Sequence, residues 1–199
     1  MKKIETIWHH ILYQAIGQRI FRHTQQDLAR QFNYSLSTIN YALTKPSQIG
    51  AIRKESKFFV LDDTIKLLYY WASVRNIEKS IIYKTYLNSP VPAREGLLLP
   101  TSIYAGYSAA AKHLTEPPAD YTQLYFYESS QHLNEIEQRF PGDVNKVPNV
   151  FVLKKHPSMD TYGQITTLPQ TFVDIWNLKD WYAKDFTVKL EEKIYELLS

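Results

Sequence analysis

The chain has 199 residues, of which 44% are hydrophobic and 22% charged, and it contains no cysteine. This is the composition of an ordinary globular protein, and the lack of cysteine excludes disulfides, thiolate metal ligands and a cysteine nucleophile. No apolar run reaches the length of a membrane span and no signal-peptide pattern follows Met1. We therefore expect a cytoplasmic protein that does not enter a membrane.

The net charge of +3 is unevenly distributed along the chain. Residues 1–75 carry eleven basic and five acidic side chains, a net of +6, whereas residues 76–199 carry a net of −3. Such an asymmetry favours a polyanion as the partner of the first part. Together with a change of pattern near Asn76, it predicts two domains, 1–75 and 76–199.

Residues 1–75 begin with two expected helices. Apolar residues at spacings of three and four predict a helix over residues 4–16, ended by Gly17. Thr24 and Asp27 form a capping-box pattern that opens a second, short helix. Asn33 then suits a tight turn, because asparagine tolerates left-handed backbone.

A third helix is expected from its N-cap Ser35 to Leu43. Pro46 is expected to stop or kink this helix near Lys45, because proline removes a backbone donor. The expected inward positions are Leu36, Ile39 and Leu43.

A hairpin and a fourth helix complete this part. The short β-prone runs 51–54 and 57–61 predict the hairpin, and Asp62 and Asp63 are suited to cap a helix over residues 64–75. The expected inward positions of that helix are Ile65, Leu68, Tyr69, Trp71 and Ala72.

The third helix and the hairpin have the residue types that read a DNA duplex. A major groove admits one helix, which needs small polar side chains facing outward, a second helix to brace it and basic residues for phosphates. Basic residues at 45, 53, 54 and 57 are expected at phosphates, and the polar residues at 37, 38, 40 and 41 at bases or backbone. The candidate DNA-binding residues are Thr24, Gln25, Ser35, Ser37, Thr38, Asn40, Tyr41, Lys45, Arg53, Lys54 and Lys57.

The run from Thr24 to Leu43, followed by Ile49-Gly50-Ala51-Ile52-Arg53, resembles the winged helix-turn-helix regulators of bacteria and archaea. The resemblance covers residues 4–75. It implies that the helix at 35–43 is the recognition helix and the hairpin at 52–61 the wing. The expected function is sequence-specific binding of double-stranded DNA by a transcriptional regulator, a repressor acting as a homodimer. The alternative is a helical module that binds another protein.

Residues 76–199 alternate between strand and helix patterns, which predicts an α/β layer domain behind the winged helix and an α+β or α/β class for the chain. The expected strands are 81–87, 121–127, 149–155 and 164–168, and the expected helices are 107–114, 130–140, 169–178 and 180–197.

Three motifs of this second part resemble the C-terminal domain of AbiE-type (abortive-infection) antitoxin regulators. They are Tyr104–Ala110 with His113-Leu114 and Pro117-Pro118, then Tyr162-Gly163, and then Leu168–Asn177. The resemblance implies a nucleotidyltransferase-like fold, repression of the protein's own operon and neutralisation of a cognate toxin.

The residues of a working nucleotidyltransferase are missing, so any such fold is degenerate. Gly106-Tyr107-Ser108 is followed by a strand that has only Glu128 in place of the acidic pair needed for Mg²⁺, and Asp174 fits a structural role. His9-His10 point in different directions on a helix, and the other histidines have no metal-site spacing.

We therefore predict no enzyme, no cofactor and no metal. Two alternatives stay open: a nucleotidyltransferase-like enzyme with a DNA-binding appendage, and a toxin-neutralising protein-binding module. The fifteen tyrosines fit a dimer interface, the surface for a cognate protein partner, a small-molecule effector pocket or an ordinary core.

Overall fold

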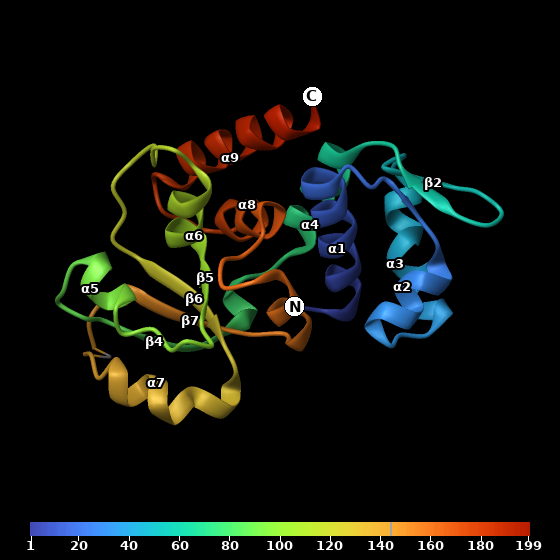
Figure 1. Cartoon of the computed structure of the whole chain (residues 1–199). Helices are drawn as coiled ribbons and strands as arrows, with labels where there is room; N and C mark the ends of the chain where they lie inside the picture. The colour runs from blue at the N-terminus through green and yellow to red at the C-terminus, as the bar shows by residue number, and fades with distance from the viewer. Residues whose placement is uncertain (144) are drawn as a thin grey trace. The chain divides into compact units, whose positions relative to one another are not determined.

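The computed structural model describes residues 1–143 and 145–199 (Figure 1). They form a mixed α+β fold with two compact units. Unit 1 comprises Met1–Arg75 with Glu192–Ser199, and unit 2 comprises Asn76–Glu191. Unit 1 carries twelve basic and seven acidic side chains, a net of +5, and unit 2 carries a net of −2. Within the described residues, no helix combines the length and apolar character needed to cross a bilayer.

Unit 1 combines helices α1 to α4 and the end of α9 with a small antiparallel sheet in the strand order β1-β3-β2. Helix α3 packs against α1, α2 and β2, and Figure 1 shows the hairpin of β2 and β3 extending away from the helices. The elements are α1 (Lys3–Gln18), β1 (Arg22–His23), α2 (Gln25–Phe32), α3 (Leu36–Gln48), β2 (Ile52–Lys54), β3 (Phe59–Leu61) and α4 (Thr64–Val74).

The local signals that start and end helices in unit 1 are mostly confirmed. Thr24 Oγ1 accepts from the Asp27 N–H at 3.1 Å and donates to the Asp27 carboxylate at 2.7 Å. Asn33 has the left-handed backbone expected of it, with φ 52°. The expectation for Gly17 is wrong: α1 continues to Gln18 and ends at Arg19, which takes the left-handed conformation at φ 59°.

Helix α3 runs through Pro46, so the expected stop near Lys45 is wrong. Proline has no N–H, and the Ala42 carbonyl four residues earlier therefore receives no helical hydrogen bond. The indole Nε1–H of Trp8 donates to this carbonyl instead, at 2.7 Å in the buried contact of α1 with α3. The helix therefore keeps a satisfied backbone and reaches Gln48.

Some inward positions also differ from the expectation. Leu36 is 50% exposed, because it occupies the first turn of α3 beyond the cover of its neighbours, whereas Ala42 and Pro46 are buried with Ile39 and Leu43. In α4, Leu67 is fully buried. Ile65 and Tyr69, two of the inward positions expected there, are only half-buried.

Unit 2 is built on a four-stranded mixed sheet in the order β4-β7-β6-β5. The central strands β6 and β7 are parallel, and both outer pairs are antiparallel. The strands are β4 (Ile81–Thr85), β5 (Ile103–Ala105), β6 (Leu124–Glu128) and β7 (Val150–Lys154). The helices are α5 (Val91–Glu95), α6 (Gly106–His113), α7 (Leu133–Arg139), α8 (Leu168–Trp176) and α9 (Ala183–Leu198), with short 3-10 turns at Glu78–Ser80, Ser130–His132 and Pro157–Tyr162.

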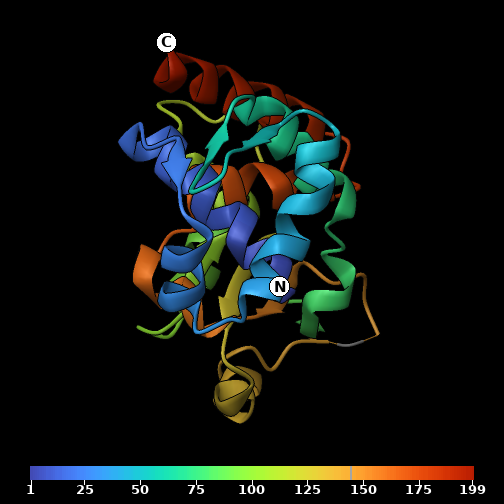
Figure 2. The ribbon, with the colours of Figure 1, turned by 90° about the vertical axis from the view of Figure 1, so that its right-hand side faces the viewer.

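Helices cover both faces of this sheet. Successive side chains of a strand point to opposite faces. Phe126 of β6 packs with Ile136 of α7, whereas the hydroxyl of Tyr127 donates to Asp174 of α8 at 2.7 Å. Figure 2 shows α7 well separated from α8 across the sheet. The last residues of α9, from Glu192, belong to unit 1.

One expectation for unit 2 is wrong, and two short elements were not expected. Residues 164–168 form no strand: Ile165 makes a single bridge with Tyr104, and Leu168 already begins α8. The short elements α5 and β5 were not expected, because five and three residues carry too little periodicity to be read from sequence.

Candidate functional site

Helix α3 presents a polar face to solvent. Its buried residues pack inward against α1, α2 and β2, which leaves the other side of the helix exposed. Tyr41 is 70% exposed, and Ser37, Asn40 and Lys45 are also exposed, while Thr38 is half-buried. Ser37, Thr38 and Asn40 are small and carry hydrogen-bonding groups, so this face can approach a polar surface closely.

Hydroxyl groups gather at the start of α3. Ser35 Oγ accepts from the Thr38 N–H at 3.2 Å, as expected for the N-cap. The same oxygen lies 2.8 Å from Ser37 Oγ and 2.9 Å from Thr38 Oγ1. Three neighbouring hydroxyls therefore lie at the N-terminus of α3, the positive end of the helix dipole. An anion such as a phosphate is stabilised at this end of a helix.

The hairpin contacts the exposed face of α3 through Lys54. Its Nζ donates to Asn40 Oδ1 at 2.9 Å, and both side chains are exposed. The hydrogen bond joins two candidate residues that lie fourteen positions apart in the chain. It leaves the amide nitrogen of Asn40 as a donor at the surface.

Arg53 is engaged by carboxylates of its own unit. Its Nε donates to Asp62 at 2.9 Å, and its Nη1 forms an ion pair with Glu55. The hydrogen bond and charge of Asp62, followed by those of Glu55, raise the pKa of Arg53. A phosphate that uses Arg53 must therefore compete with two carboxylates, a feature that the sequence pattern alone did not indicate.

An open cleft of about 490 Å³ lies between the start of α2, the first residue of α3 and the turn of the hairpin. It brings together the candidate residues Thr24, Gln25 and Lys57. The other lining residues, which sequence reasoning did not select, are Gln26, Leu36, Glu55, Ser56 and Phe58.

Arg22 is a further basic residue of this region. It is exposed, and its guanidinium lies 3.7 Å from the centre of the Phe58 ring, so the cation rests on the aromatic wall of the cleft. In the sequence, Arg22 is marked only by its position two residues before the capping residue Thr24. The two-residue strand that turns it toward the hairpin is too short to predict.

Two carboxylates of unit 2 that the sequence analysis considered are buried in hydrogen-bond networks. Asp174 is fully buried and accepts from Tyr127 and from the Gln170 amide at 3.0 Å. Glu128 is also fully buried and accepts from Thr101, Ser102 and the Ser129 N–H. Its burial pushes the pKa up, but hydrogen bonds led by that of Ser129 outweigh this effect, and the net pKa lies below the usual value.

Gly106 and His113, which the sequence analysis also singled out, have structural roles. Gly106 takes a φ of +53° at the start of α6, where an added Cβ would meet the Tyr125 ring at 3.1 Å, so a glycine is required by both backbone and space. His113 hydrogen-bonds the Thr166 carbonyl at 2.7 Å. Among residues 1–143 and 145–199, no group of three or more His, Asp or Glu side chains is placed to hold a metal ion.

Comparison of the whole chain with protein-family models, with curated proteins and with solved structures finds no match.

Proposed function

We propose that unit 1 is a winged helix-turn-helix module that binds double-stranded DNA with sequence preference. In this proposal α3 is the recognition helix, α2 braces it and the β2–β3 hairpin is the wing. The protein then acts as a transcriptional regulator, a repressor that binds its operator as a homodimer. Two copies double the number of base contacts that one short helix can make.

Three features of unit 1 support the proposal. The order α1-β1-α2-α3-β2-β3, with the sheet order β1-β3-β2, is the one a winged helix requires. The exposed face of α3 carries small polar side chains. The net charge of +5 on unit 1 suits a polyanionic partner.

The contact of Lys54 with Asn40 carries the most weight. It places a base-reading residue type and a phosphate-binding residue type on one continuous exposed surface, one from the helix and one from the hairpin. A recognition helix flanked by a basic wing needs this juxtaposition, because base contacts specify the site while phosphate contacts position the protein.

Fluorescence-anisotropy titration of the full chain tests the proposal. The probes are the duplex upstream of the protein's own gene and a shuffled duplex of equal length, at about 50 and about 200 mM salt. We expect preference for the upstream duplex and a steep loss of affinity with salt. Absence of binding to both duplexes at the lower salt concentration contradicts the proposal.

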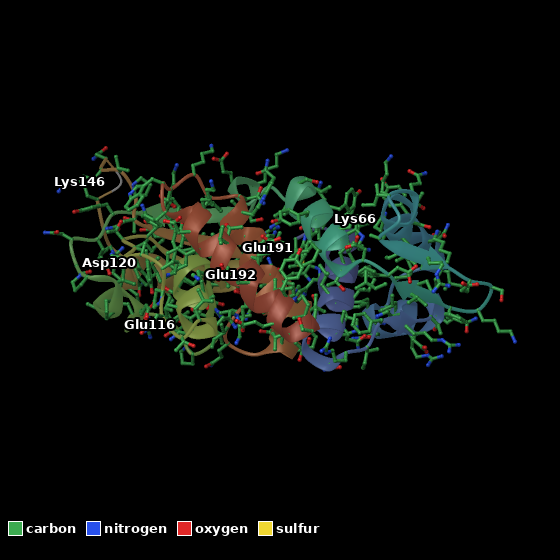
Figure 3. All side chains as sticks on the ribbon, turned by 90° about the horizontal axis from the view of Figure 1, so that it is seen from above. Lys66, Glu116, Asp120, Lys146, Glu191 and Glu192 are labelled. Carbon is green, nitrogen blue, oxygen red and sulfur yellow. The ribbon has the colours of Figure 1, made fainter. Side chains whose placement is uncertain are left out.

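A matched pair of variants locates the surface. Lys57→Ala removes a charge from the hairpin turn, and Lys66→Ala removes one from α4 (Figure 3). Lys66 pairs with Asp63. We expect Lys57→Ala to lower the slope of log affinity against log salt by about one and Lys66→Ala to leave it unchanged. Equal effects of the two variants would mean that net charge alone, and not this surface, holds the DNA.

A further inference from the structure

Unit 2 has an open cleft of about 790 Å³ that no part of the proposed function uses. The segment after β4, the helix α5 and the segment before β7 form its walls. Its volume lies in the range of sites that hold small organic molecules. Among the lining residues are Pro90, Val91 and Pro148, which give the cleft apolar walls.

Arg94 lines this cleft and is only 3% exposed. Its Nη1 donates to the backbone carbonyl of Asn149 at 2.9 Å, and its Nε has no hydrogen-bond partner. In the described part of the chain, no carboxylate lies within ion-pair distance of the guanidinium. Burying a charge without a counter-charge costs free energy, so an anion that binds beside this guanidinium would be stabilised by it.

The electrostatics agree with the geometry. Burial lowers the pKa of Arg94, and the electrostatic effects of Tyr86 and Glu95, which act in the opposite direction, do not restore it. An anion placed against the guanidinium would offset the cost of its burial. The hydroxyl of Ser89, another lining residue, is a second buried polar atom without a partner.

The rim of the cleft limits the charge of the ligand. Lys146 lies with its Nζ 5.1 Å from the centre of the Tyr86 ring, and Asp120 is an exposed lining residue (Figure 3). One buried cation, one cation at the rim and one rim carboxylate favour a single negative charge over two. The apolar walls favour a ligand whose remaining surface is hydrocarbon.

We propose that this cleft binds a small organic acid, whose carboxylate is held by Arg94 and Ser89 and whose apolar body rests on Pro90, Val91 and Pro148. The planar guanidinium matches a carboxylate in shape and charge, and its hydrogen bonds are stronger for being ionic. The site is independent of the DNA-binding proposal, because all of its residues belong to unit 2.

The test uses the full chain and two fluorinated acids, 4-fluorobenzoate and 4-fluorophenylacetate, observed by ¹⁹F NMR. The neutral 4-fluorobenzamide is the probe control. We expect concentration-dependent broadening with at least one acid and none with the amide. Absence of broadening by both acids, or equal broadening by acid and amide, overturns the proposal. Displacement of the acid by an equal concentration of inorganic phosphate overturns the assignment to a carboxylate.

Two variants of unit 2 locate the binding. Arg94→Met removes the buried charge, and Arg139→Met removes an arginine that pairs with Glu135 on α7. We expect Arg94→Met to raise the Kd for the acid about tenfold or more and Arg139→Met to leave it unchanged. A Kd that is unchanged in Arg94→Met overturns the proposal.

Thermal unfolding separates a binding role from a structural one. An unpaired buried charge does not stabilise the fold, so the Arg94→Met protein should unfold at the same or a higher temperature than the wild type. If the unfolding temperature of Arg94→Met falls clearly and the wild type binds no acid, the role of Arg94 is structural, through its hydrogen bond to Asn149.

Discussion

At the scale of single residues, the exposed hydrogen bond of Lys54 to Asn40 makes the two side chains interdependent. Asparagine recognises adenine by donating from its amide nitrogen and accepting with its oxygen. In the free protein the oxygen is already occupied by the lysine. This oxygen has a second lone pair, so Asn40 can read a base either while it still accepts from Lys54 or after the ammonium group has moved to a nearby phosphate.

We predict different consequences of removing the two side chains. Asn40→Ala should weaken binding to the preferred duplex by about 1–3 kcal/mol and bring it closer to the affinity for the shuffled duplex. Lys54→Ala should weaken binding to both duplexes by a similar factor and reduce the salt slope by about one. Anisotropy titrations of each variant on both duplexes measure these changes.

The double variant provides the control. If Lys54 restrains Asn40 in the free protein, the effects of the two substitutions on binding to the preferred duplex should not add. Strict additivity would indicate that the hydrogen bond is irrelevant to recognition. Retention of full sequence discrimination by Asn40→Ala would place the reading face elsewhere on unit 1.

At the scale of elements, the sequence predicted features that depend on residues within one helical turn, such as helix caps. It did not predict features that depend on residues far apart in the chain. The N-caps Thr24 and Ser35 and the turn at Asn33 depend on neighbours within three residues, and all three are confirmed. The path of α3 through Pro46 depends on Trp8, which is 34 positions away from the carbonyl it satisfies. No local pattern carries that information.

The same reasoning applies to the candidate site. The residue types of Asn40, Lys54 and Lys57 are readable from the sequence because they follow the face of a helix and the ends of a hairpin. The pairing of Arg53 with Asp62 depends on the register of β2 against β3, in which Arg53 faces Val60. Register follows from packing and turn geometry together, so the sequence alone did not show that this guanidinium is already engaged.

We predict that Trp8→Phe lowers the free energy of unfolding by about 1–3 kcal/mol beyond its loss of volume, because the buried Ala42 carbonyl loses the hydrogen bond from the Trp8 indole. Trp71→Phe is the matched control. Trp71 is also fully buried, but its indole nitrogen has no hydrogen-bond partner, so this variant loses volume without losing a hydrogen bond. Urea unfolding of both variants gives the comparison.

A second substitution checks the cause. Pro46→Ala restores a backbone N–H that can reach the Ala42 carbonyl within α3. In that background Trp8→Phe should cost no more than Trp71→Phe. Equal costs of the two tryptophan variants in the wild-type background would show that the indole hydrogen bond contributes nothing to the stability of unit 1.

At the scale of the whole molecule, both units contain histidines that the fold keeps neutral. Burial lowers the pKa of His9 to about 3, with a smaller effect of the neighbouring His10. Burial likewise lowers the pKa of His10 to about 4, aided by His23. The other histidines whose pKa is lowered, in each case mainly by burial, are His23, His113 and His156.

These shifts predict that the protein loses stability in mild acid. Each folded-state pKa lies below the unfolded value of 6.5, so the unfolded chain binds more protons at every pH between the two values. The stabilisation is complete above pH 6.5 and is lost as the pH falls toward 3. For His9 alone the loss between pH 6.5 and pH 5 is about 2 kcal/mol, since each pH unit corresponds to about 1.4 kcal/mol.

Urea unfolding at pH 7, 6 and 5, at constant ionic strength, measures this loss. We expect the free energy of unfolding to fall steadily over the series and the His9→Gln variant to fall less steeply, by about 1 kcal/mol per pH unit. The slope is the informative quantity, because the substitution also changes packing and hence the stability at pH 7. A wild-type stability that stays level from pH 7 to pH 5 would mean that the buried imidazoles take up protons in the folded state, and that burial does not govern their titration.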